Sequence, residues 1–70
     1  MQFKIMGPNG HDTVEFKRTE LEDAREKFFQ LTNELQRTAA VPTGNGEHRL
    51  IREFDPTQEE VLFIPHLIGG

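Results

Sequence analysis

Apolar and polar residues alternate at the start of the chain as they do in a β-hairpin. Phe3 and Ile5 share one face of a first expected strand, and Val14 and Phe16 share one face of a second, because successive side chains of a strand point to opposite faces. The residues at 7–10, Gly-Pro-Asn-Gly, are typical turn formers. The sequence therefore predicts two antiparallel strands joined by a loop.

A helix is predicted next, over residues 20–36. Thr19 and Glu22 have the spacing of a capping box at its start. Phe29 lies off the apolar stripe of this helix, so it either covers an edge of the core or is an exposed contact. The stripe itself follows 3-4-3-4 spacing and consists of Leu21, Ala24, Phe28, Leu31 and Leu35.

Three further strands are predicted at 38–41, 48–54 and 61–64. In the second of these, Leu50 and Ile51 are adjacent apolar residues, so the pattern does not decide which face is buried. The third is a continuous apolar run, Val-Leu-Phe-Ile, which is typical of a central strand with both faces covered. Pro65 is expected to end it.

This order of elements predicts an α+β fold in which one helix packs across a mixed sheet of four to five strands. A hairpin, a crossing helix and a last strand buried beside the first form the β-grasp arrangement, in which the first and last strands run parallel. We expect one domain over residues 1–65 and a flexible C-terminal tail over 66–70.

Composition narrows the function classes. The 70 residues carry a net charge of −4 and no cysteine, which disfavours nucleic acid as a partner and removes disulfides and thiol catalysis. No apolar run approaches the ~20 residues of a membrane span, and the first residues lack a signal-peptide pattern. We expect a cytoplasmic protein without a membrane partner.

The dipeptide Gly69-Gly70 follows the apolar segment and is a candidate binding element. Glycine lacks a Cβ, so a partner can enclose its backbone closely. A frayed terminus has the same composition. The dipeptide alone therefore leaves both interpretations open.

The rest of the chain resembles the ubiquitin-like β-grasp family. Residues 1–5 (Met-Gln-Phe-Lys-Ile) and 13–16 (Thr-Val-Glu-Phe) resemble ubiquitin's opening hairpin. Residues 59–70, Glu-Glu-Val-Leu-Phe-Ile-Pro-His-Leu-Ile-Gly-Gly, are similar to the closing strand of the small sulfur carriers of molybdopterin and thiamine synthesis. The ending is also similar to bacteriophage-type sequences, so the resemblance covers bacterial and phage ubiquitin-like proteins.

The resemblance implies a protein modifier or carrier that is not itself an enzyme. Gly70 would supply a carboxylate that a partner activating enzyme adenylates with ATP, and Gly69 would let the tail pass through a narrow channel. The tail residues that would contact the partner are Pro65, His66, Leu67 and Ile68. A conjugating enzyme and a target protein, or a sulfur acceptor, would follow, and the protein itself would bind no cofactor.

Two alternatives stay open beside isopeptide conjugation. One is a sulfur carrier in cofactor biosynthesis. The other is a non-conjugating interaction or structural protein on the same fold, such as a small phage component. A metal site is not expected, because the three histidines, His11, His48 and His66, lack the spacing of a ligand signature.

Overall fold

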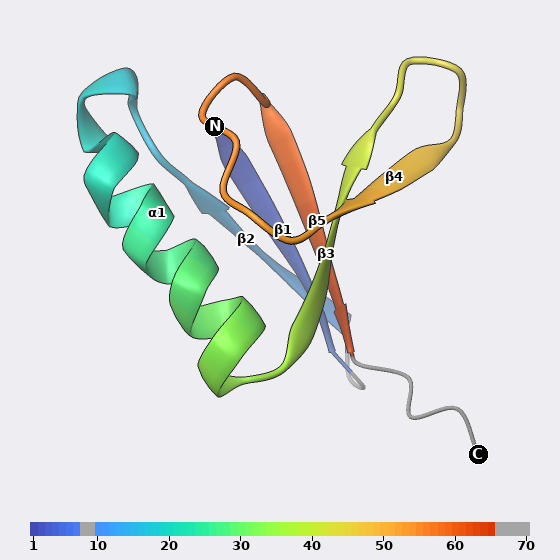
Figure 1. Ribbon diagram of the computed structural model, residues 1–70, viewed down its shortest axis with the longest axis horizontal. Coiled ribbons are helices and arrows are strands. Elements are labelled where there is room, and N and C mark those ends of the chain that lie inside the picture. The colour runs from blue at the N-terminus through green and yellow to red at the C-terminus, as the bar shows by residue number, and fades with distance from the viewer. Residues whose placement is uncertain (8–9, 66–70) are drawn as a thin grey trace.

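The computed structural model describes residues 1–7 and 10–65 (Figure 1). A β-hairpin comes first, then a helical segment, then three strands. The first strands are β1 (Gln2–Gly7) and β2 (Gly10–Glu15). The helical segment comprises a 3-10 turn η1 (Arg18–Glu20), the α-helix α1 (Leu21–Phe29) and a π-helical turn η2 (Gln30–Glu34). The last strands are β3 (Arg37–Pro42), β4 (His48–Ile51) and β5 (Glu60–Pro65).

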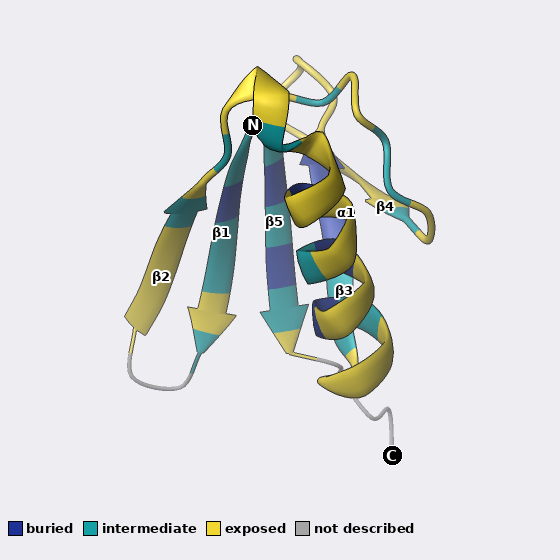
Figure 2. Cartoon of the chain, turned by 90° about the vertical axis from the view of Figure 1, so that its left-hand side faces the viewer, coloured by how far each residue is buried: buried dark blue, intermediate teal, exposed yellow. Residues whose placement is uncertain are grey.

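All five strands form one mixed sheet in the order β2-β1-β5-β3-β4. The strands β1 and β5 are parallel neighbours, whereas the other three pairs are antiparallel. The helix α1 lies across one face of this sheet (Figure 2). The predicted α+β fold, with one helix on a mixed sheet and parallel first and last strands, is thereby confirmed.

Phenylalanine side chains form the centre of the core. Phe63 on β5 contacts Phe3 on β1 and Phe28 on α1, with ring centroids 4.9 Å and 5.6 Å apart. Phe16 adds a contact to Phe3, and Phe54 adds one to Phe28. All four pairs meet edge to face, the arrangement that the ring quadrupole favours. The central strand is therefore anchored to its neighbour and to the helix through the same ring.

The start of the helix differs from the predicted capping box. The carboxylate of Glu20, rather than that of Glu22, accepts a hydrogen bond at 2.8 Å, and its donor is the backbone amide of Lys17. The Glu20 amide in turn donates to the Lys17 carbonyl at 2.9 Å. The prediction that Thr19 caps the helix was wrong. The helical segment begins with a 3-10 turn whose N-cap is Lys17, two residues before Thr19.

The end of the helix also differs, because its last turn is widened. The amide of Leu35 donates to the carbonyl of Gln30 at 3.0 Å, five residues back, and the helical segment ends at Glu34 instead of residue 36. A π turn holds more residues than an α turn, so it rotates Leu35 off the predicted stripe and leaves it 55% exposed. Gln36 then reverses the chain with φ at 53°.

The apolar stripe is confirmed only at its middle. Ala24, Phe28 and Leu31 are buried, whereas Leu21 and Leu35, at the two ends, are exposed. Burial by the sheet is thus limited to the central turns of the helix.

Two predictions for the later strands need correction. The strand predicted at 48–54 ends at Ile51, because the chain leaves the sheet in a loop over residues 52–59. Leu50 is 67% exposed while Ile51 packs against the core, which settles the face that the pattern left open. In β5 the central position is confirmed, but Leu62 and Ile64 are only half-buried, because the single helix covers one face of the sheet.

Candidate functional site

The candidate tail is described only at its first residue. Pro65 is exposed at the end of β5, where it pairs in register with Arg37 of β3. The remaining predicted site residues, His66, Leu67, Ile68, Gly69 and Gly70, lie outside the described residues. What the structure provides is therefore the position and surroundings of the tail's base.

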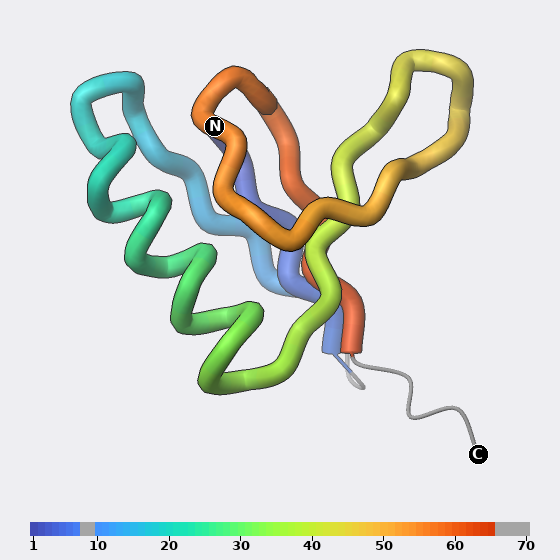
Figure 3. The backbone as a smooth tube through the Cα atoms, in the orientation of Figure 1, coloured from blue at the N-terminus to red at the C-terminus, as the bar shows by residue number. Residues whose placement is uncertain are grey.

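The base lies at one end of the sheet, where three connections meet. Because β1 and β5 are parallel, Gly7 of β1 lies at the same end as Pro65. The helical segment also finishes here and enters β3 through Gln36 and Arg37 (Figure 1 and Figure 3). We call this region the Pro65 end of the sheet.

The Pro65 end carries two exposed apolar side chains and one arginine whose Nε atom has no hydrogen-bond partner among the described residues. Met6 and Leu35 are 36% and 55% exposed. The Nε atom of Arg37 is buried and has no hydrogen-bond partner among the described residues. A partner that binds this end would meet the exposed side chains of Met6 and Leu35, whereas the Nε atom of Arg37 is buried and out of its reach.

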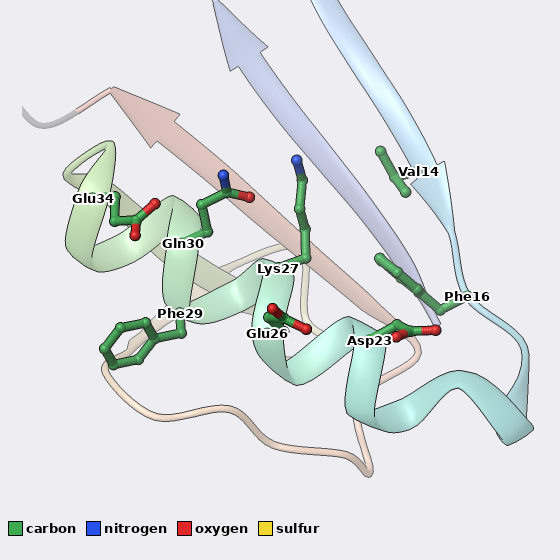
Figure 4. A pocket seen from close by; sticks show the side chains of 8 residues that line it. All are labelled: Val14, Phe16, Asp23, Glu26, Lys27, Phe29, Gln30 and Glu34. Atoms are coloured by element: carbon green, nitrogen blue, oxygen red, sulfur yellow. The ribbon is translucent and has the colours of Figure 1, made fainter.

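A groove of about 570 Å³ lies between β2 and α1. On the strand side it is lined by Val14 and Phe16 (Figure 4). On the helix side, Lys27 extends toward the strands, whereas Phe29 points away from them. Three carboxylates, from Asp23, Glu26 and Glu34, give the helix side of this groove an acidic rim.

Phe29 is a surface residue, which settles the alternative that the sequence left open. It is 61% exposed and borders three neighbouring grooves on the helix. The second of these joins it to Leu21, Phe54 and Pro56. Sequence reasoning missed this apolar surface because only the loop over 52–59 brings Phe54 and Pro56 against the helix.

The same loop is held by one carboxylate. Asp55 accepts hydrogen bonds from the hydroxyl and amide of Thr57, at 2.6 Å and 2.9 Å, and from the Gln58 side chain at 3.3 Å. Hydrogen bonding by the Thr57 side chain is the main reason why the pKa of Asp55 lies below its ordinary value. Because these partners are all local, the lowered pKa reflects an ordered turn rather than a reactive centre.

Two of the three histidines lie on opposite edges of the sheet. His11 belongs to β2 and His48 to β4, the first and last strands in the sheet order, so the fold does not gather them. His66 lies outside the described residues. Within residues 1–7 and 10–65, no group of three or more histidine, cysteine or acidic side chains is placed to hold a metal ion.

Comparisons with known proteins leave the chain without an assigned family. No protein-family model matches it, and no curated protein or solved structure matches it significantly. In the part of the chain that the structure describes, no helix has the length and apolarity to cross a membrane.

Proposed function

We propose that the protein is a ubiquitin-like modifier or carrier whose Gly70 carboxylate is activated by a partner enzyme in the cytoplasm. The observation that carries this proposal is the position of β5. This strand lies between β1, its parallel neighbour, and β3, as in the β-grasp arrangement, and it leads directly into the segment that contains Gly69 and Gly70.

A central strand can hold the segment that follows it in a fixed position while another protein binds that segment. Hydrogen-bonded ladders run along both sides of β5, and Val61 and Phe63 are fully buried beneath the helix. Pro65, the last residue of β5, lacks an amide hydrogen and so cannot donate a hydrogen bond to a neighbouring strand. The body of the domain would thus hold the start of the tail in one position while a partner binds residues 66–70.

The proposed chemistry belongs to the partner. The Gly70 carboxylate would attack the α-phosphate of ATP, which releases pyrophosphate and forms an acyl adenylate. A cysteine thiolate or a sulfide would then displace AMP, giving a thioester or a thiocarboxylate, and an amine of a target protein would be the final acceptor in conjugation. The protein acts as the substrate of this sequence and supplies no catalytic group.

An interaction protein without conjugation is the second candidate. It is favoured by Phe29, whose 61% exposure on a helix is unusual for a phenylalanine. With Leu21, Phe54 and Pro56 it lines one groove on the helix surface, which a partner's apolar side chain could enter. In this case binding would depend on the helix rather than on Gly70.

Deletion of Gly70 separates the two candidates. The full chain is incubated with a candidate activating enzyme and ATP, and adenylate formation is followed by pyrophosphate release and by mass spectrometry. We expect an adduct with the wild-type protein and with the control variant Phe29→Ala, and none after deletion of Gly70. An adduct that persists after the deletion would contradict the modifier proposal.

Intact mass of the natural protein distinguishes conjugation from sulfur transfer. A carboxylate in which one oxygen is replaced by sulfur supports the carrier. A covalent link between Gly70 and a lysine of another protein supports the modifier. Partner binding that is lost in Phe29→Ala, without either product, supports the interaction protein instead.

A further inference from the structure

The sheet has two free edges, and the first is β2. The amide of Phe16 donates to the carbonyl of Met1 at 2.8 Å, and the amino group of Met1 donates to the carbonyl of Phe16 at 2.9 Å. Hydrogen-bonded pairs alternate along an antiparallel ladder. The residues whose backbone groups turn away from β1 are therefore His11, Thr13 and Glu15.

The second free edge is β4. The amide of Thr43 donates to the carbonyl of Glu47 at 2.9 Å where β3 and β4 connect, which fixes the same alternation on this side. Within β4, the residues whose backbone groups turn away from β3 are therefore His48 and Leu50. Among residues 1–7 and 10–65, both edges thus present N–H and C=O groups without a partner strand, of the kind that bind another strand.

The directions of the two edge strands are complementary. Following the pairings across the sheet, β2 runs opposite to β1 and β5, whereas β4 runs in their direction. A second copy placed beside the first in the same orientation would therefore bring its β4 antiparallel to β2. The outward residues of both edges point their side chains to the face opposite the helix, so the helices of both copies would lie on the same face of one continuous sheet.

The charges of the two edges are opposite. On the helix side of β2 lies the exposed Asp12. On the helix side of β4 lies the exposed Arg49, and Arg52 follows the strand. Neither Asp12 nor Arg49 forms an ion pair among the described residues, where the one salt bridge joins Lys4 and Glu60.

From these observations we infer that the protein associates with further copies of itself head to tail, through β2 of one copy and β4 of the next. Two registers pair every residue of β4 with β2. One places Arg49 directly opposite Asp12, and the other places His48 opposite Glu15, Leu50 opposite Thr13 and Ile51 opposite Asp12. In the second register Asp12 and Arg49 are diagonal neighbours on the helix side, within reach of each other. Because this contact joins two different surfaces, it leaves a free edge at each end and continues into a filament.

Pairing of like edges is opposed by charge. Two copies of β2 joined antiparallel about Thr13 would bring their Asp12 side chains diagonally together. Two copies of β4 would bring their Arg49 side chains opposite or diagonal to each other. The mixed contact places Asp12 beside Arg49 and brings neither of these two side chains next to its own copy. The short β4, of four residues, limits it to weak association.

Sedimentation velocity of the full chain tests the inference. From about 10 μM to about 1 mM, a range that spans weak dissociation constants, we expect the weight-average sedimentation coefficient to rise with concentration. Charge reversal by Asp12→Arg or by Arg49→Asp should remove most of this rise, and the variant that combines both should restore it. Circular dichroism confirms that each variant is folded.

Each other outcome overturns the inference. A wild-type protein that stays monomeric throughout this range excludes the contact. Loss of association in only one of the two single variants, or in neither, shows that Asp12 and Arg49 do not lie beside each other in the contact. As an independent check, Thr13→Pro removes an outward amide that β1 does not use, so it should abolish association, whereas Thr13→Ala should not.

Discussion

The two faces of the sheet exclude water by different means, although the same five strands form both. The face beneath α1 is filled by rings and branched side chains, with Phe3, Val61 and Phe63 fully buried. The opposite face carries an ion pair between Lys4 and Glu60 and half-buried aliphatic side chains. Even so, Ala40 is 3% exposed there, because its cross-strand neighbours Leu62 and Leu50 flank it.

This comparison shows how a small domain divides its stabilising contacts. One helix can cover only one face of a sheet, so the apolar residues of β5 contribute unequally according to which way they point. The helix face should hold most of the free energy of unfolding. The open face remains available for contacts with other molecules.

The largest difference between the faces should appear in adjacent residues of β5. Phe63→Ala should lower the free energy of unfolding by about 3–5 kcal/mol, because it empties the centre of the core. Leu62→Ala on the other face should cost about 1 kcal/mol, because its side chain is only half-buried. Urea unfolding followed by circular dichroism measures both, and equal losses would contradict the unequal division between the faces.

The return of the chain from the helix to the sheet should be strained at Gln36. Its φ of 53° is left-handed, so Gln36→Gly should raise the free energy of unfolding by about 1 kcal/mol. The same substitution at Gln30, inside the helical segment, should lower it by about 1 kcal/mol. Thermal unfolding of the two variants gives opposite shifts in Tm if the assignment is right, and shifts of one sign if it is not.

The ion pair on the open face should contribute little. Lys4 Nζ and Glu60 Oε1 are 2.7 Å apart, but their side chains are 42% and 35% exposed. Lys4→Gln should therefore cost about 0.2–1 kcal/mol, and this loss should shrink in high salt, which screens exposed charges. Lys17→Gln is the matched control, since no ion pair of Lys17 is found among the described residues.

The smallest effect should be the loss of stability at acid pH that comes from Asp55, in the loop over residues 52–59. The pKa of Asp55 is lowered in the folded state, chiefly by its hydrogen bond from Thr57, so ionised Asp55 stabilises the fold above the unfolded-state pKa. This contribution is lost as the pH falls through the folded-state pKa, below about 4. The stability difference between the wild-type protein and Asp55→Asn should therefore narrow from pH 5 to pH 3 in thermal melts, and a constant difference would contradict it.

Much of the local structure could be predicted because it depends on neighbours in sequence. The alternation of Phe3 and Ile5 with polar residues identified β1, and Ala24, Phe28 and Leu31 identified the buried side of the helix. The capping of the helix was mispredicted because Glu20 and Glu22 are both plausible partners in sequence. Only the 3-10 turn at Arg18–Glu20 selects between them.

The sequence predicted the candidate site as the segment 65–70. The structure describes only Pro65 of it, so the rest of the site stays a prediction. Its surroundings were not predictable. Strand pairing places Arg37 beside Pro65, and the widened turn of the helix places Leu35 two residues before Arg37 in an exposed position. A pattern of neighbouring residues in the sequence does not predict this arrangement.

The sequence by itself determined the order of the strands and the helix, and the middle of the buried stripe, because hydrophobic periodicity acts over a few residues. Tertiary structure alone decided that Phe29 is exposed, that Phe54 joins it, and that β2 and β4 end the sheet with opposite charges. These features arise from the pairing of the strands and from the fact that one helix covers only one face of the sheet. Both depend on contacts between distant segments, which periodicity along the chain does not encode.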